Sequence, residues 1–175
     1  MLLRALALTD RHAIQALIKD AFSGFPWYLD YSQTELDNQW QSASTESGFA
    51  GLVVANDEGT IAGASWWHLP SPDTIRGNKL ATFILNTRAD RVLIWEDAIL
   101  VRQMYQRQGI GETLRRAFID EVRNISDRAL ILSRMRSDNV PSLLLAEKLG
   151  FMRTGARSKE KDDPPVFQEY WYLLT

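Results

Sequence analysis

The first part of the chain changes from strand-like to helix-like spacing of its apolar residues. Residues 2–6 predict a short strand, and the apolar positions that follow recur at i, i+3, i+4 and i+7, the spacing of one helix face. Thr9 or Asp10 is the expected N-terminal cap of that helix. A second helix is expected to start near Ser32.

The middle of the chain reads mainly as strands. Apolar runs over 48–56 and 60–69 flank a short polar segment, which predicts an antiparallel hairpin with Gly59 in a left-handed conformation. Residues 70–90 have no clear pattern, and either a short helix or a strand around 80–85 fits them. The run over 92–101 predicts a strongly apolar strand, which two acidic residues interrupt.

The second half continues the alternation of helix and strand. A helix is expected over 109–125 and a buried strand over 129–134. Asp138 or Asn139 is expected to cap a further helix, and Gly150 is expected to end it, because glycine is the usual residue at a left-handed helix terminus.

Two more strands, over 151–158 and 166–174, are expected to close the chain around an acidic turn that contains proline. The order of elements predicts a mixed α/β (α+β) fold in which one central sheet is flanked by helices. With 175 residues and no visible linker, residues 1–175 are expected to form a single domain.

Composition narrows the possible chemistry. Hydrophobic residues make up 45% and charged residues 24%, as in globular proteins. The absence of cysteine excludes disulfides, thiolate metal sites and cysteine nucleophiles. The two histidines, His12 and His68, are far apart in sequence, so no metal is expected. Since we find no apolar run long enough to cross a bilayer and no signal peptide, we expect a cytoplasmic protein without a membrane partner.

Charge is distributed unevenly. Residues 1–100 carry 7 Lys and Arg against 12 Asp and Glu, whereas residues 101–161 carry 13 against 7. This asymmetry favours an anion near the second half and a cation near the first, although ordinary variation in surface charge explains the counts equally well. Basic residues form no extended run and few aromatic residues accompany them, so nucleic acid is not an expected partner.

The segment QRQGIGET, residues 106–113, lies between a predicted strand and a predicted helix. Two glycines there allow several main-chain N–H groups to point at one anion at the positive end of the helix dipole. A dinucleotide-binding fingerprint requires a third glycine where Leu114 stands, and a nucleoside-triphosphate loop requires a Gly-Lys pair, which the chain lacks.

The segment Gln106 to Gly111 matches the pattern Q/R-x-x-G-x-G/A and therefore resembles the signature of the GNAT superfamily of N-acetyltransferases. The strand that ends at Val101 and the stretch from Asn139 to Leu-Gly-Phe at 149–151 also resemble family motifs, in the family order. The resemblance is strong over about 90–155. It implies a GNAT-like acyl-CoA N-acyltransferase fold and acetyl-CoA as co-substrate.

In proteins of this family the glycine loop binds the pyrophosphate of acetyl-CoA. The resemblance implies that main-chain amides of this loop hold the phosphates here, while the end of the preceding strand pairs with the pantetheine arm and the Val101 N–H contacts the thioester oxygen. The implied cofactor-binding residues are Leu100, Val101, Gln106, Arg107, Gln108, Gly109, Ile110, Gly111, Thr113 and Asn139.

Acetyl transfer to an amine requires the amine to lose a proton, because an alkyl ammonium group has a pKa near 10.4. Asp97 and Glu96 are the candidate catalytic bases, since they interrupt an apolar strand beside the expected reaction centre. Strand alternation places them on opposite faces. Asp97 shares its face with Val101 and matches a position that is often acidic in the family, so it is preferred; a bulge in the strand would exchange the two.

The chain departs from the family at Ala146, where many members carry a tyrosine that protonates the leaving thiolate. A thiol pKa near 8.5 makes the thiolate a tolerable leaving group without that acid. The departure leaves open which residue, if any, protonates the thiolate.

In the family the acceptor site forms from the first helices, the second to fourth strands and the C-terminal hairpin. Trp27, Tyr28 and Trp67 are the expected substrate-binding residues, since aromatic faces hold cationic amines. Phe25 belongs to the same group of aromatic residues. Core packing is the alternative for Trp67. His68 is expected to be an exposed residue at a strand end, and a role as acid or base is its alternative.

The sequence therefore predicts an enzyme that transfers an acetyl group from acetyl-CoA to a primary amine by direct attack. The acceptor is a small-molecule or peptide amine whose identity stays open. The alternative is a catalytically silent acyl-CoA-binding sensor or interaction module. The family resemblance also suggests a homodimer, because exposed strands often pair between subunits in this family.

Overall fold

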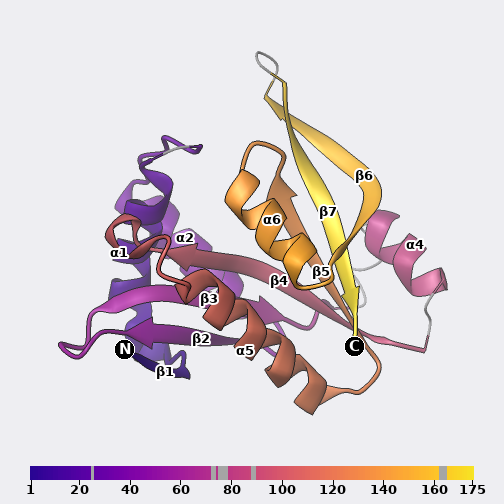
Figure 1. Ribbon diagram of the computed structural model, residues 1–175, viewed down its shortest axis with the longest axis horizontal. Helices are drawn as coiled ribbons and strands as arrows, with labels where there is room; N and C mark the ends of the chain where they lie inside the picture. Colours follow the sequence, from indigo (N-terminus) through magenta and orange to yellow (C-terminus); the bar gives the residue numbers. More distant parts are fainter. Residues whose placement is uncertain (25, 72–73, 75–78, 88–89, 162–164) are drawn as a thin grey trace. The chain divides into compact units, whose positions relative to one another are not determined.

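The structure is a computed structural model that describes residues 1–24, 26–71, 74, 79–87, 90–161 and 165–175. The aromatic Phe25 and the acidic turn at 162–164 lie outside the described residues. The strands of the described part form one mixed seven-stranded sheet in the order β1-β2-β3-β4-β5-β7-β6 (Figure 1). The chain divides into two compact units, and strand β4 contributes residues to both.

The first unit comprises Met1–His68 and Asp97–Asp120. Its strands are β1 (Leu2–Ala5), β2 (Ala50–Ala55), β3 (Ile61–His68) and the second half of β4 (Val92–Val101). Its helical elements are η1 (Leu8–Asp10), α1 (Arg11–Phe22), α2 (Gln33–Ser44), η2 (Gln103–Tyr105) and the first part of α5 (Ile110–Ile125). Strands β1, β2 and β3 pair antiparallel, and Gly59 turns the β2–β3 hairpin with φ +83°, as the sequence predicts.

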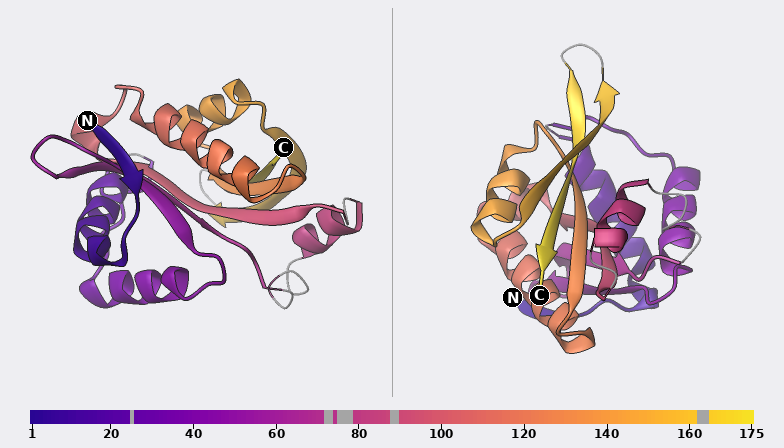
Figure 2. Two further views of the ribbon diagram at one scale, coloured as in Figure 1. Left: turned by 90° about the horizontal axis from the view of Figure 1, so that it is seen from below. Right: turned by 90° about the vertical axis from the view of Figure 1, so that its right-hand side faces the viewer.

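Helices α1 and α2 lie on one face of β2 and β3, and α5 lies on the other face (Figure 2). The first face is sealed by a buried apolar cluster to which α1, α2, β2, β3 and β4 all contribute; its members are Ile14, Leu17, Ile18, Leu36, Trp40, Val53, Ile61, Ala64 and Leu100. On the second face, Gly63 of β3 lies so close to α5 that a Cβ there would stand 2.9 Å from Ile110 Cγ2. The close fit fixes the start of α5 against the sheet.

The second unit comprises Leu69–Glu96 and Glu121–Thr175. It holds α4 (Lys79–Thr87), β5 (Ala129–Arg136), α6 (Val140–Lys148), β6 (Met152–Lys161) and β7 (Val166–Leu174). The first half of β4 runs parallel to β5, and β7 pairs antiparallel with both β5 and β6. Helices α4 and α6 lie on opposite sides of β5 and β7 (Figure 2). Of the two structures expected around 80–85, a helix or a strand, the structure has a helix, α4.

Two predicted helix caps are wrong in their chemistry. Asp10 directly precedes α1, but its carboxylate accepts hydrogen bonds from Arg4 and from the Ala7 N–H instead of capping the helix. Asn139 directly precedes α6, yet its side chain makes no capping hydrogen bond; its main-chain carbonyl accepts from the Ser142 N–H. Ser32 does cap α2, in a reciprocal arrangement with Glu35.

Candidate active site

The two adjacent carboxylates of β4 meet different partners. Glu96 is 3% exposed, and Ser133 Oγ donates a hydrogen bond to its Oε2 at 2.5 Å within the second unit. Asp97 belongs to the first unit, where its Oδ2 lies 2.7 Å from Nδ1 of His68. Only Asp97 keeps an accessible carboxylate, with 23% of its side chain exposed. A proton acceptor for a bound molecule must be reachable, so the contrast favours Asp97.

His68 is the buried partner of this pair. Its side chain is 9% exposed, and it ends β3, which hydrogen-bonds to β4 in the sheet. The expectation of an exposed strand-end histidine is therefore wrong. No sequence pattern indicates the pair, because His68 and Asp97 are 29 positions apart and the contact exists only once β3 and β4 lie side by side.

Opposing effects act on the imidazole. Burial is the largest and lowers the pKa of His68, since it disfavours the charged ring. The hydrogen bond to Asp97 and the negative charges of Asp97 and Glu46 together outweigh burial, so the pKa of His68 is raised above its usual value of 6.5. The carboxylates around the ring thus favour its protonated form.

Asp97 lies next to residues of β4 that pack in the core of the first unit. Ala98 packs against the apolar cluster to which Leu100 belongs, so strict alternation would place Asp97 on the opposite face of the strand. Its carboxylate contacts His68 of the neighbouring strand β3, and the charge of Glu46 also acts on that imidazole. The bulge considered for this strand in the sequence analysis stays a prediction.

The glycine loop has the backbone geometry of an anion-binding turn. Arg107 and Gly109 both have positive φ, +62° and +80°. A Cβ on Gly109 would meet nothing within 4 Å, so the space beside this residue is open. Residues Gln106 to Gly109 are exposed, and Ile110 anchors the start of α5 in the core at 5% exposure. Successive amides in such a conformation form a concave nest for negative charge.

Within the described part of the chain, the main-chain N–H groups from Arg107 to Gly111 have no hydrogen-bond acceptor, whereas the Thr113 N–H donates to the Gly109 carbonyl. Two side chains support the loop from within. Gln106 Nε2 donates to the Val101 carbonyl at 3.3 Å, and Gln108 Nε2 donates to the Met104 carbonyl at 3.2 Å. Exposed, unpaired donors at a helix N-terminus fit a diphosphate.

A model of the "Acetyltransferase (GNAT) family" matches residues 11–151 of the sequence. The chain belongs to this family. The match includes β4, the glycine loop and α6, and it confirms the family that the sequence motifs predict. None of the curated proteins compared with the chain matches it.

Solved GNAT structures confirm the predicted fold. A ribosomal-protein-alanine N-acetyltransferase from Brucella melitensis is 20% identical, with a TM-score of 0.73 and 100% of both chains covered. The ribosomal-protein-S18-alanine N-acetyltransferase from Escherichia coli is 18% identical, with a TM-score of 0.72 over 99% of this chain and 92% of that chain. A proposed acetyltransferase from Salmonella typhimurium, solved with its cofactor acetyl-CoA, is 20% identical, with a TM-score of 0.72 over 99% and 92%.

The remaining cofactor-binding candidates of this GNAT chain lie at the ends of two elements. Leu100 is 8% exposed and packs in the core, so its side chain is structural while its main chain belongs to β4. Val101 ends β4 and receives the Gln106 hydrogen bond at its carbonyl. Thr113 is exposed on the first turn of α5. Asn139 lies in the second unit, before α6.

The three aromatic candidates have different surroundings. Trp27 packs edge-on against Phe22, with ring centroids 4.9 Å apart. Tyr28 is 72% exposed and has a φ of +49°, which is uncommon for a residue with a side chain. Trp67 is 2% exposed and its ring lies 4.8 Å from that of Phe118 on α5, so it packs in the core. Tyr28 is the candidate that solvent reaches best.

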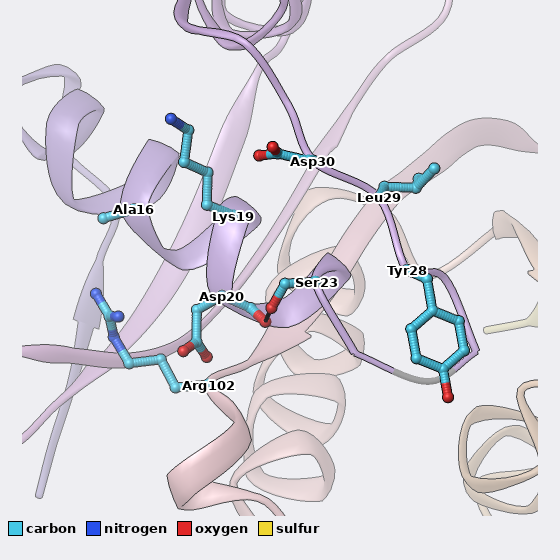
Figure 3. A pocket seen from close by; sticks show the side chains of 8 residues that line it. All are labelled: Ala16, Lys19, Asp20, Ser23, Tyr28, Leu29, Asp30 and Arg102. Carbon is cyan, nitrogen blue, oxygen red and sulfur yellow. Dashed lines mark hydrogen bonds between the residues drawn. The ribbon is translucent and has the colours of Figure 1, made fainter.

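Tyr28 also lines a cavity of about 570 Å³ at the C-terminal end of α1 (Figure 3). The lining residues are Ala16, Lys19, Asp20, Ser23, Tyr28, Leu29, Asp30 and Arg102. Arg102 directly follows β4, and Asp20 accepts a 2.7 Å hydrogen bond from the Gln103 N–H. The cavity carries both signs of charge, and Trp27 and Trp67 do not line it.

Two observations bear on metal and membrane chemistry. Among the described residues, no group of three or more His, Asp and Glu side chains is arranged to hold a metal ion. No helix formed by those residues has the length and apolar character needed to cross a bilayer.

Proposed function

We propose that this GNAT protein transfers an acetyl group from acetyl-CoA to a primary amine by direct attack, without a covalent enzyme intermediate. The observation that carries the proposal is the loop from Arg107 to Gly111, exposed over 107–109, whose main-chain N–H groups have no acceptor in the described structure. The loop follows the strand that carries Asp97, so an anion site and a proton acceptor belong to one continuous segment. Family membership supports the same reaction class.

The proposed cofactor contacts come mainly from the main chain. The N–H groups from Gln108 to Gly111 hold the diphosphate at the start of α5, where the helix dipole favours negative charge. The exposed Arg107 adds a positive charge, and the Val101 N–H is the proposed donor to the thioester oxygen. Acetyl-CoA, when bound, supplies an acetyl group activated as a thioester.

Asp97 is the proposed general base. Its carboxylate is partly exposed, whereas Glu96 is buried against Ser133. A bound ammonium group loses a proton to Asp97 and becomes a neutral amine that can attack the thioester carbonyl. General-base assistance of this kind contributes about 10²- to 10⁴-fold in rate.

No hydroxyl at position 146 can protonate the leaving thiolate, because the residue there is alanine. Ala146 is also fully buried in α6. A thiolate is a tolerable leaving group, since its conjugate thiol has a pKa near 8.5. We propose that water or the second proton of the attacking amine completes this step.

The proposed acceptor is a cationic primary amine, either a small molecule or the N-terminus of a peptide. Asp97 and Glu46 place negative charge around His68, and Asp20 and Asp30 line the cavity beside Tyr28. The Escherichia coli and Brucella melitensis neighbours are named as acetyltransferases of ribosomal-protein alanine, so a peptide with N-terminal alanine belongs among the acceptors to test.

The test is a thiol-release screen with acetyl-CoA and a varied panel of amines: polyamines, aminoglycosides, amino acids and peptides that begin with alanine. We expect at least one amine to release thiol and to gain 42 Da by mass spectrometry, the mass of an added acetyl group. Tight coenzyme A binding without turnover on any amine would instead support the second candidate, a silent acyl-CoA sensor, which the missing hydroxyl at Ala146 favours.

The single domain over residues 1–175, the cytoplasmic location and a homodimer stay predictions of the sequence, as does the absence of a nucleic-acid partner.

A further inference from the structure

His68 and Asp97 form a pair in which the imidazole is buried and the carboxylate is more accessible. The imidazole is 9% exposed and the carboxylate 23%, and 2.7 Å separates His68 Nδ1 from Asp97 Oδ2. An amine in solvent can therefore reach the carboxylate more readily than the ring behind it. The carboxylate is thus the outer group and the imidazole the inner one. In a pair where a carboxylate only orients an accessible histidine, the two positions are reversed.

We propose that His68 is a positioning residue of acetyl transfer, which holds the Asp97 carboxylate in place and shares with it the proton taken from the amine. The inference rests on the proposed function, because it deepens the role given there to Asp97. The geometry that carries it is the direct contact between the two side chains, one at the end of β3 and one on β4, with the buried ring behind the more exposed carboxylate.

The proton balance of the step is simple. The pair has a net charge of −1 when the imidazole is neutral, and it accepts one proton from R–NH₃⁺ to reach a net charge of 0. The resulting R–NH₂ uses its lone pair to form the C–N bond, while the electron pair of the C–S bond leaves with sulfur. The second amine proton goes to the departing sulfur, and the proton held by the pair returns to solvent.

The charges around His68 decide when the pair can work. Asp97 faces the ring from β4, and Glu46 acts on it from the segment after α2. Burial lowers the pKa of His68, but these two carboxylates raise it overall above its usual value. Below that pKa the pair already holds its proton. The rate of transfer should therefore fall as the pH drops through an ionisation above 6.5.

The first experiment needs no cofactor and no acceptor. The ring protons of His68 are followed by NMR as a function of pH in the wild-type protein and in Asp97→Asn, with His12 as the internal reference. If the two groups are coupled, the titration midpoint of His68 moves to lower pH in Asp97→Asn while that of His12 stays in place. A His68 midpoint that is the same in both proteins overturns the proposal.

The second experiment uses His68→Asn, whose amide keeps a donor near the position of Nδ1 but cannot be protonated, and His68→Leu, which has no donor. Thiol release is measured against pH with one fixed amine, so that ionisation of the amine is common to all proteins. The matched control is His12→Asn, on an exposed position of α1.

We expect the acid limb of kcat to move down by at least one pH unit in His68→Asn, toward the ordinary range of a carboxylate near 3.9. His68→Leu should lose about 10-fold or more in kcat, part of what a general base supplies, while KM for acetyl-CoA stays the same. A uniform loss in both variants with an unmoved acid limb would make His68 purely structural and overturn the inference. If no amine is acetylated at any pH, the proposed function fails, and the NMR titration still decides whether the pair is coupled.

Discussion

Asp97 and Glu96 are neighbours in sequence with the same chemistry, and the structure gives them different surroundings. Glu96 accepts a hydrogen bond from Ser133 in a buried site, and Asp97 contacts His68 while remaining partly exposed. A base must lie within reach of the proton that it removes. Accessibility, more than acidity, is therefore what supports Asp97 as the proposed base.

Asp97→Asn should lower kcat by about 10²- to 10⁴-fold at neutral pH, because the amide cannot accept the amine proton. Coenzyme A affinity should not change, since the proposed contacts to the diphosphate come from the glycine loop. Glu96→Gln is the matched variant, and its amide oxygen can still accept from Ser133. Steady-state thiol release measures kcat, and titration calorimetry measures coenzyme A affinity. A larger loss of kcat in Glu96→Gln than in Asp97→Asn would identify Glu96 as the base instead.

The raised pKa of His68 also makes a prediction about stability. A group whose pKa is higher in the folded state stabilises that state fully below its unfolded value of 6.5, and the contribution is lost as the pH rises through the folded value. His68→Asn should therefore lower the urea midpoint more at pH 5.5 than at pH 9. Urea unfolding of wild type, His68→Asn and His12→Asn at both pH values checks this, and a pH-independent difference would contradict the raised pKa.

Sequence reasoning at this scale uses side-chain chemistry and neighbours in the chain. It singled out Asp97 and Glu96, because carboxylates in an apolar strand are unusual. It misplaced His68, because burial at the end of β3 depends on β4, which is distant in sequence. It also misread Asp10, whose carboxylate is taken by Arg4 from β1, an interaction that a local capping rule does not consider.

At the scale of elements, the central feature is the turn that joins β4 to α5. Arg107 and Gly109 adopt positive φ, and the first turn of α5 is held in place by Ile110 and by the close approach of β3 at Gly63. The turn is thus pinned on one side and open on the other. This arrangement leaves its amides available to an anion.

Gly109→Ala should weaken coenzyme A binding by at least 10-fold, because alanine disfavours the left-handed conformation that aims the amides. Gly59→Ala is a matched control: its φ is +83°, and its Cβ would also meet nothing within 4 Å. Both changes should cost about 1–2 kcal/mol of folding free energy. Titration calorimetry with coenzyme A and urea unfolding check the pair, and equal affinity in both variants would remove the loop from the site.

Most elements were predictable because their patterns are strong. The β2–β3 hairpin, β4, α5 and the closing β6–β7 pair all follow from apolar periodicity with glycine and polar residues between them. Residues 70–90 were not predictable as a helix or a strand, because an apolar run of this length is compatible with both. There α4 forms over Lys79–Thr87, and Ile84 packs with Leu93 of β4.

At the scale of the whole molecule, the family is settled by three sequence motifs in order and by a family model that spans residues 11–151. The acceptor is not settled in this way, because a fold shared at 16–21% identity among the neighbours supports many acceptors. The cofactor side of the proposed site uses the main chain, so the glycine pattern alone was enough to name its candidates, whose roles stay predictions. Acceptor recognition depends on side-chain placement, as the different surroundings of Trp27, Tyr28 and Trp67 illustrate.

Binding of coenzyme A should stabilise the folded protein as a whole. At 100 times its dissociation constant, the ligand is expected to add about 2.7 kcal/mol to the free energy of unfolding. Thermal unfolding with and without coenzyme A measures this, with Gly59→Ala and Gly109→Ala in parallel. Stabilisation of the Gly109→Ala variant equal to that of Gly59→Ala would contradict binding at the loop.

The most direct test of the account is a crystal structure of the protein grown with coenzyme A. The account predicts that the diphosphate oxygens lie within hydrogen-bonding distance of the main-chain N–H groups from Gln108 to Gly111, at the start of α5. A structure with the coenzyme bound elsewhere, or with the loop closed by neighbouring side chains and empty, would contradict it.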